Sequence, residues 1–168
     1  FVCGGTGGHV FPALAIAESL KKKGIQEISF AGRANSMEQR LVSPHWPFYE
    51  MTAEPLRRGS FVRNLALPFK LSKSYVHAKH LIQQINPDVI VATGGYVSFP
   101  IVLAAGRLGK PIYIQEQNAV AGVANKYGSR YASMIFVTSE DAVKAFQHPN
   151  VKVLGNPVRE LPAVETLA

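Results

Sequence analysis

The chain has 168 residues, of which 47% are hydrophobic and 17% are charged. This composition excludes an intrinsically disordered chain, and the length suits one compact domain with a hydrophobic core. The single cysteine, Cys3, excludes an internal disulfide and a cysteine-rich zinc site, and it is compatible with a reducing compartment.

Positive charge is concentrated in one segment of the chain. The 18 Lys and Arg residues exceed the 11 Asp and Glu residues by seven. The segment from Pro55 to Pro87 holds six of the basic residues and no acidic one: Arg57, Arg58, Arg63, Lys70, Lys73 and Lys79. Such a local excess indicates an anionic partner, which could be nucleic acid, a lipid surface or a phosphorylated substrate.

Short β-branched runs alternate with segments of helical periodicity. In chain order we expect strand Phe1–Cys3, helix Val10–Lys23, strand Glu27–Ala31, helix Ser36–Leu41, strand Pro47–Met51, helix Phe69–Ile85, strand Asp88–Ala92, helix Phe99–Leu108, strand Ile112–Gln115, helix Gly122–Tyr131, strand Met134–Thr138, helix Glu140–Phe146 and strand Val151–Leu154. This alternation predicts an α/β fold, with a Rossmann-like, doubly wound parallel sheet of about seven strands.

Hydrophobic and capping patterns predict how several of these helices begin and pack. Ser36 and Gln39 have the spacing of a capping box, and Ser139 is expected to cap the helix after it. The uncharged run from Val89 to Gly106 contains two adjacent glycines and a proline, so we predict a strand, a loop and a buried helix rather than a membrane span. Helix 69–85 should bury the stripe Leu71, Tyr75, Ala78, Ile82 and Ile85.

Three loops that follow predicted strands carry the residues best suited to bind a ligand. They are Gly4–His9, Thr93–Ser98 and Gln115–Asn118. Because the carboxyl ends of parallel strands meet at one edge of a sheet, we expect these loops to converge. Paired glycines before a helix let backbone N–H groups and the helix dipole bind an oxyanion. Two such loops suit a diphosphate, although paired glycines also occur in tight turns that bind nothing.

Two ionisable residues lie in these loops. His9 follows the first glycine loop, where it could act as a general base, donate a hydrogen bond to a phosphate, or simply cap the helix. Glu116 ends an otherwise apolar strand and is either a turn residue or a substrate ligand. No Asp, Glu or His cluster has the spacing of metal ligands, so neither a metal site nor a cofactor is predicted.

Common nucleotide-binding motifs are incomplete in this sequence. Gly5 and Gly7 are followed by Val10, where the dinucleotide fingerprint requires a third glycine. The strand predicted at 27–31 is followed by Gly32 and Arg33 without the acid that would bind a ribose, and the Walker lysine is absent. A nicotinamide site and a P-loop are therefore weakly supported.

The stretch Arg57–Lys70 mixes basic residues with large apolar ones. This mixture is typical of a surface that contacts an anionic membrane. A loop that covers the core and turns its cations to water is the alternative. No aromatic pattern that could follow a strand of nucleic acid is present, so no nucleic-acid partner is expected. The predicted membrane-contacting residues are Phe61, Arg63, Leu65, Phe69, Lys70 and Lys73.

Taken together and in order, these motifs resemble one family. The segments Gly4–Ala15, Gly94–Ser98, Glu116–Asn118 with Asn125–Lys126, and Gly155–Arg159 resemble the bacterial MurG family, which belongs to the GT-B glycosyltransferases of family 28. The resemblance covers nearly the whole chain. It implies that residues 1–154 are the acceptor-binding N-terminal half of a GT-B fold, that residues 155–168 are an interdomain linker, and that the C-terminal donor domain is absent.

The resemblance also implies an activity. It is the inverting, metal-independent transfer of N-acetylglucosamine from UDP-N-acetylglucosamine to the C4 hydroxyl of the muramoyl sugar of lipid I, the undecaprenyl-diphosphate-linked muramoyl-pentapeptide of peptidoglycan synthesis. This chain is expected to be inactive without the donor domain. The implied location is the cytoplasmic face of the bacterial inner membrane, where the protein would bind peripherally to the anionic leaflet.

Site residues carry over from the family by position. The donor contacts implied in this way are Thr6, Gly7, Gly8, Asn118 and Arg159. The residues implied near the acceptor diphosphate are Gly94, Gly95 and Tyr96. His9 and Glu116 match the polar residues expected near the attacking hydroxyl. Either could be the base, and His9 is preferred.

Two other functions remain open from the sequence. One is a membrane-docking, acceptor-binding subunit that recruits a separate catalytic chain. The other is a nucleotide-sugar epimerase with the same architecture, which would need no lipid surface.

Overall fold

The centre of the molecule is a sheet of seven parallel strands. The structure is a computed structural model that describes residues 1–53 and 67–159. The strands are β1 (Val2–Cys3), β2 (Phe30–Arg33), β3 (Phe48–Met51), β4 (Ile90–Gly94), β5 (Ile112–Glu116), β6 (Met134–Val137) and β7 (Val151–Val153). Their order across the sheet is β3-β2-β1-β4-β5-β6-β7, which confirms the predicted doubly wound α/β fold.

The strand order contains one switch point. The chain runs outward from β1 to β3, then crosses back to place β4 on the other side of β1 and runs outward again to β7. Ligands of doubly wound sheets bind in the crevice at the carboxyl ends of the strands where the order reverses. In this protein the order reverses between β1 and β4, which are the strands that lead into the two glycine loops.

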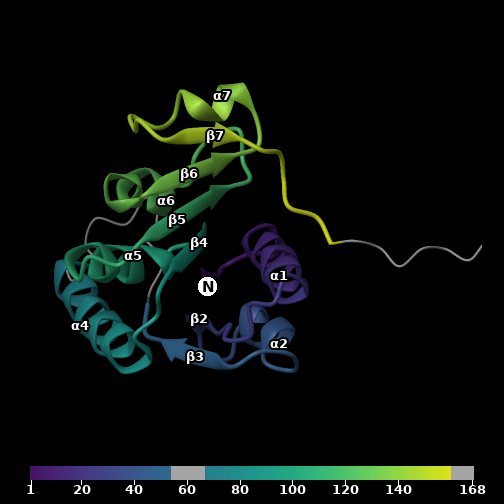
Figure 1. Cartoon of the computed structure of the whole chain (residues 1–168). Coiled ribbons are helices and arrows are strands. Elements are labelled where there is room, and N and C mark those ends of the chain that lie inside the picture. The colour runs from purple at the N-terminus through teal and green to yellow at the C-terminus, as the bar shows by residue number, and fades with distance from the viewer. Residues whose placement is uncertain (54–66, 160–168) are drawn as a thin grey trace, which may run out of the picture.

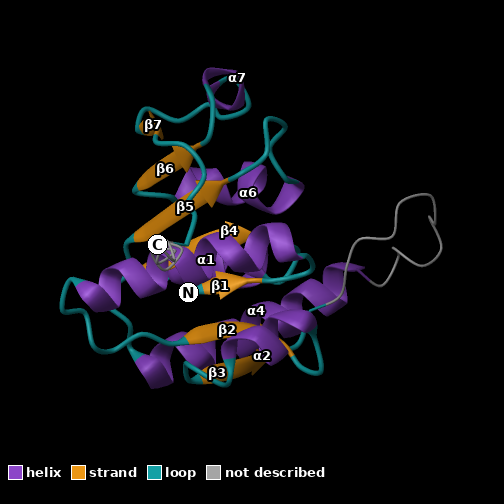
Figure 2. Ribbon diagram, turned by 90° about the vertical axis from the view of Figure 1, so that its right-hand side faces the viewer, coloured by secondary structure: helices purple, strands orange, loops and turns teal. Residues whose placement is uncertain are grey.

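Helices cover both faces of the sheet (Figures 1 and 2). They are α1 (Gly7–Lys22), α2 (Met37–Val42), α4 (Leu67–Ile85), α5 (Ser98–Arg107), α6 (Val123–Gly128) and α7 (Glu140–Val143). Helices α1 and α2 lie on one face, and α4, α5 and α6 lie on the other. This arrangement follows from right-handed crossovers, because the direction of travel across the sheet changes after β3.

Each face of the sheet has its own hydrophobic cluster. The larger one lies under α4 and α5 and extends from β3 to β6. The smaller one lies under α1 and α2 and consists of Cys3, Val10, Ala13, Leu14, Ala17, Ile28, Phe30, Val42 and Trp46. Burial raises the pKa of the Cys3 thiol to about 12, so this cysteine is an inert core residue.

Several element boundaries lie elsewhere than the sequence predicts, and those of β2, β4 and α1 matter for the site. Strand β2 begins at Phe30, where its pairing with β3 begins, and it ends at Arg33 rather than Ala31. Strand β4 ends at Gly94 rather than at residue 92. Helix α1 begins at Gly7 rather than Val10, so the second glycine pair and the histidine form its first turn.

Helix α4 differs from its predicted packing at one end. Tyr75, Ala78, Ile82 and Ile85 pack into the core as predicted, and Leu81 joins them. Leu71 is 37% exposed, so its prediction as a core residue is wrong. The N-terminal end of α4 projects beyond the neighbouring helices, which explains why an apolar residue at the correct spacing near that end still meets solvent (Figure 2).

Two capping predictions have different outcomes. The hydroxyl of Ser36 accepts a hydrogen bond from the Gln39 N–H, which confirms its half of the capping box, but the Gln39 side chain accepts from the Asn35 N–H instead. Ser139 precedes α7 without a side-chain capping bond, and this helix ends at Val143.

Helix α6 is also shorter than predicted, because a 3₁₀ turn replaces its last residues. None of the helices in the described part of the chain is long and apolar enough to span a bilayer.

Candidate functional site

The two glycine loops meet at the switch point. Gly5 and Gly95 both have positive φ angles, +87° and +88°. A Cβ atom on Gly95 would lie 2.0 Å from the carbonyl oxygen of Gly4. The backbones of the two loops are therefore in direct contact, and only glycine fits at position 95.

The third loop joins them through an asparagine. Asn125, on α6, donates from Nδ2 to the Gln115 carbonyl oxygen at 3.3 Å and to Oε2 of Glu116 at 3.0 Å. A Cβ atom on Gly94 would lie 3.3 Å from the same Nδ2 and 2.6 Å from Cδ2 of His9. The His9 ring and the Asn125 amide therefore both lie against the backbone of Gly94, where a larger residue would not fit. The structure brings all three loops together, as the sheet topology requires.

Both the ring and the backbone carbonyl of His9 make hydrogen bonds. Its Nδ1 lies 2.9 Å from Oγ1 of Thr6, and its carbonyl oxygen accepts a hydrogen bond of 2.6 Å from the hydroxyl of Thr93. Burial lowers the pKa of the half-buried imidazole below its ordinary value of 6.5, and the Glu116 carboxylate and the Gly4 carbonyl oppose this shift. The imidazole is therefore neutral at pH 7, the form that can accept a proton.

Glu116 is fully buried, and its carboxylate organises its own loop. Oε1 accepts hydrogen bonds of 2.9 Å from the backbone and side-chain nitrogens of Asn118. Oε2 accepts from the Gly122 N–H at 2.9 Å and from Asn125 at 3.0 Å. All four partners are N–H donors, so each carboxylate oxygen accepts two hydrogen bonds. Glu116 contributes a fixed negative charge beside His9 and holds loop 117–122 in place.

Tyr96 lies beside Gly5, near two charged residues. Burial raises the pKa of its hydroxyl above 10.0, the positive charge of Arg33 opposes this shift, and the negative charge of Glu38 adds to it. Glu38 is 2% exposed, and a Cβ atom on Gly4 would lie 2.7 Å from its Oε1. The buried Glu38 carboxylate therefore packs closely against the backbone of Gly4.

Arg33, Glu38 and Asn125 lie at the site although their sequence context does not predict it. Arg33 is the last residue of β2, and it reaches the carboxyl edge because the strand ends two residues later than predicted. The sequence around Glu38 does not indicate a buried site residue, because a charged residue in a short helix ordinarily faces solvent. Asn125 belongs to the segment Asn125–Lys126 of the family resemblance, which implies no role for it.

Arg159 is the predicted site residue that the structure places elsewhere. Its guanidinium forms a two-point ion pair with Glu18, with Nε 3.2 Å from Oε2 and Nη2 against Oε1. Glu18 is on α1, about 14 Å along the helix axis from His9. Asn118 remains at the site, although its amide is engaged with Glu116.

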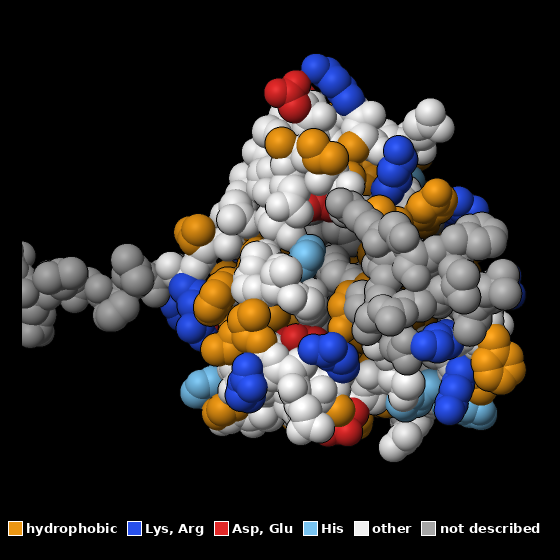
Figure 3. Space-filling model, turned by 180° about the vertical axis from the view of Figure 1, so that it is seen from behind, with side chains coloured by type: hydrophobic (Ala, Val, Ile, Leu, Met, Phe, Trp, Pro, Cys, Tyr) orange, Lys and Arg blue, Asp and Glu red, His pale blue; other side chains and the backbone are white. Residues whose placement is uncertain are grey.

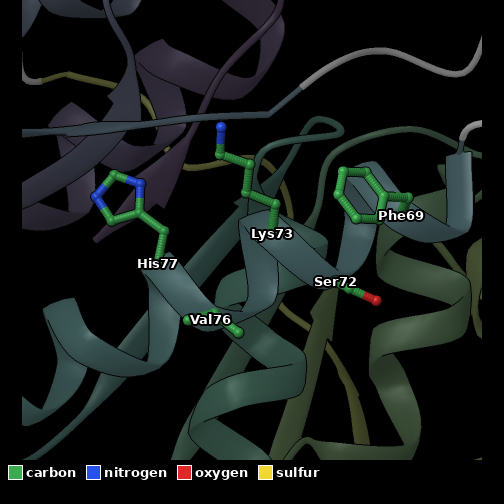
Figure 4. Close-up of a pocket in the computed structure, with 5 residues that line it drawn as sticks. All are labelled: Phe69, Ser72, Lys73, Val76 and His77. Carbon is green, nitrogen blue, oxygen red and sulfur yellow. The ribbon is translucent and has the colours of Figure 1, made fainter.

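The predicted membrane-contacting residues are only partly described. Phe61, Arg63 and Leu65 lie outside the described residues. Phe69 is 78% exposed on α4, and hydrophobic, basic and histidine side chains lie side by side along that edge of the molecule (Figure 3). A shallow, open pocket of about 450 Å³ lies along the helix, lined by Phe69, Ser72, Lys73, Val76 and His77 (Figure 4).

The described residues contain no group of three or more His, Cys, Asp or Glu side chains that could hold a metal ion. The candidate site offers backbone N–H groups, a neutral imidazole and a buried carboxylate. This set of groups can bind an anion and accept a proton from a hydroxyl.

Comparison with known proteins identifies the family. The fold and the site define a doubly wound α/β domain whose two glycine loops meet at its switch point. The chain belongs to glycosyltransferase family 28, because residues 1–137 match the family's N-terminal domain. This finding confirms the family resemblance seen in the sequence.

Similar proteins extend the comparison. The chain is 41% identical over 160 residues to the UDP-N-acetylglucosamine--N-acetylmuramyl-(pentapeptide) pyrophosphoryl-undecaprenol N-acetylglucosamine transferase of Shewanella woodyi, covering 95% of this chain and 43% of that protein. Identity to the Salinibacter ruber protein of the same name is 40%, covering 95% and 44%. The chain therefore spans less than half of these relatives.

Solved structures agree with this assignment. The crystal structure of Acinetobacter baumannii MurG matches with a TM-score of 0.78 and 36% identity, over 95% of this chain and 45% of that one. The match confirms a Rossmann-like N-terminal half of the GT-B fold. A putative UDP-N-acetylglucosamine 2-epimerase from Listeria monocytogenes matches with a TM-score of 0.67 but 16% identity, over 92% of this chain and 44% of that one, which shows a shared fold alone.

Proposed function

We propose that this chain is the acceptor-binding half of an N-acetylglucosaminyltransferase. The reaction transfers N-acetylglucosamine from UDP-N-acetylglucosamine to the C4 hydroxyl of the muramoyl sugar of lipid I. The names of relatives about 40% identical over 95% of the chain support this substrate pair. The observation that carries the proposal is the neutral His9 imidazole, held at the contact between two glycine loops in a family 28 chain.

The proposed mechanism assigns the base to His9. Nε2 accepts the proton of the C4 hydroxyl while the hydroxyl oxygen bonds to the anomeric carbon of the donor. The bond from that carbon to the UDP oxygen breaks, and UDP leaves with the electron pair, so the configuration inverts. A positioned base contributes about 10²–10⁴-fold to such a step. The nearby Glu116 carboxylate stabilises the imidazolium that forms.

The anionic groups of the substrates are assigned to the loops. The donor contacts are Thr6, Gly7, Gly8, Asn118 and Arg159, and the acceptor diphosphate lies against Gly94, Gly95 and Tyr96. Helices α1 and α5 begin at these loops, and their N-terminal N–H groups favour phosphate oxygens. Arg33 adds a cation beside Tyr96. Arg159 has to leave Glu18 to reach the donor.

The lipid-linked acceptor requires a membrane surface, and α4 is the proposed contact. Its exposed Phe69 and Val76 lie beside Lys73, which suits the anionic inner leaflet on the cytoplasmic side. The membrane-docking subunit is the second candidate function, and the same surface favours it. The epimerase has only the shared fold in its favour.

Activity of a joined protein tests the proposal. In the joined protein, this chain is followed by the C-terminal half of a family 28 relative, and it receives lipid I and UDP-N-acetylglucosamine. We expect turnover, and a loss of about 10²-fold or more in His9→Ala. Absence of turnover in a folded joined protein would favour the docking subunit. Full turnover in the double variant His9→Ala, Glu116→Ala would refute the site assignment.

A further inference from the structure

Thr6 holds an unusual position at the start of α1. It is the N-cap residue, where a threonine hydroxyl ordinarily accepts a hydrogen bond from an N–H of the first turn. Its side chain makes no capping bond, and Oγ1 lies 2.9 Å from Nδ1 of His9 instead. In residues 1–53 and 67–159 no acceptor is found for the N–H groups of Gly7 and Gly8.

The surroundings leave the Thr6 hydroxyl open to a ligand. Thr6 is exposed, whereas His9 is half-buried. A Cβ atom on Gly8 would have Oγ1 of Thr6 as its one neighbour within 4 Å, at 3.6 Å. An anion that binds the free N–H groups of Gly7 and Gly8 therefore reaches this hydroxyl without displacing protein atoms.

The hydrogen bond between Thr6 and His9 can be made in two ways. A hydroxyl has one proton to donate and two lone pairs, and a neutral imidazole has one protonated and one unprotonated nitrogen. If Thr6 donates to Nδ1, the imidazole proton is on Nε2. If Nδ1–H donates to Thr6, Nε2 carries a lone pair and can act as a base.

We propose that Thr6 couples binding of the donor diphosphate to the tautomer of His9. A phosphate oxygen takes the one hydroxyl proton of Thr6, and Oγ1 can then only accept from Nδ1–H. This leaves Nε2 unprotonated on the side of the ring that faces Gly94, where a Cβ atom added to Gly94 would lie 2.9 Å from Nε2. Thr6 is thus a positioning residue that prepares the base only when the donor is bound. The inference rests on the proposed function of the site.

Nuclear magnetic resonance of the joined protein tests the coupling directly. The ring nitrogens of 15N-labelled histidines distinguish the two tautomers, and the signal missing from His9→Gln identifies His9 among the histidines of the joined protein, of which this chain supplies five. At about pH 8 the imidazole is neutral, since its pKa is lowered. We expect UDP to move His9 to the Nδ1–H tautomer in the natural sequence and in Thr6→Ser, but not in Thr6→Val.

Kinetics give a second readout. At saturating donor, Thr6→Val should lose about 10²-fold in kcat, and Thr6→Ser should recover most of it, because serine restores the hydroxyl. Bound UDP that leaves the His9 tautomer unchanged, or Thr6→Val with an unaltered kcat, overturns the coupling but not the proposed function. UDP that does not bind the folded joined protein overturns both.

Discussion

Gly95 is the residue with the least room for substitution. Its φ of +88° is left-handed, and an added Cβ would overlap the Gly4 carbonyl oxygen, which is backbone and cannot rotate away. We expect Gly95→Ala to lower the free energy of unfolding by at least about 3 kcal/mol. Gly109→Ala is the control, because Gly109 has φ +69° but open space around it, and the loss should be about 1 kcal/mol. Urea unfolding measures both, and equal losses would contradict the steric argument.

An amide cannot replace the Glu116 carboxylate without loss of hydrogen bonds, because four N–H donors surround this carboxylate. In Glu116→Gln, the amide nitrogen would face N–H groups that it cannot accept from. We expect about 3 kcal/mol less stability and faster hydrogen exchange at the Gly122 N–H. Val120→Ala changes the same loop at a side chain that is 83% exposed, and it should leave both unchanged. Slow exchange at Gly122 in the glutamine variant would be inconsistent with this account.

The lowered pKa of His9 predicts a pH dependence of activity. A base must be unprotonated, so kcat/KM of the joined protein should fall as the pH drops through a value below the ordinary 6.5 of histidine. Burial lowers the pKa, and the Glu116 carboxylate, the charged group that acts on His9, raises it. Removing that charge should therefore move the acid limb to still lower pH. An acid limb at or above 6.5 would show that His9 is not the titrating group.

At the scale of elements, the sequence predicts most of the sheet because each strand is a short β-branched run between turn residues. The ends of β2 and β4 were misplaced because they depend on pairing partners, which local sequence does not contain. Arg33 was missed for that reason. The hydrogen bond from Thr93 to the His9 carbonyl oxygen joins segments 84 residues apart, which no local pattern specifies.

The predicted membrane contact is on helix α4, and the contribution of its positive charge to membrane binding can be measured. Binding of this chain to vesicles should need anionic lipid and should weaken with added salt, since the interaction is screened. Lys73→Ala should weaken it about 5-fold, the effect of roughly one basic residue at such a surface. Lys152→Ala, which removes an exposed lysine on β7, is the matched control. Equal binding to neutral vesicles at every salt concentration would contradict the electrostatic part.

At the scale of the molecule, the ion pair between Arg159 and Glu18 ties the end of the described chain to α1. Both side chains are partly exposed, so the pair should contribute less than about 1 kcal/mol to stability. If Arg159 binds the donor, Glu18→Ala releases it, and UDP should bind the joined protein up to about 5-fold more tightly. Calorimetric titration measures this change. Weaker or unchanged binding would show that Arg159 does not exchange partners.

Burial of Cys3 in β1 gives the chain a built-in chemical reporter. Cys3 is the single cysteine, its side chain is fully buried, and its thiol is protonated at any ordinary pH. An alkylating reagent can therefore modify it only when the central strand leaves the sheet. The rate of alkylation then measures how often the middle of the molecule opens, directly beneath the glycine loops, without any added label. A ligand that joins those loops should slow that rate in proportion to its occupancy.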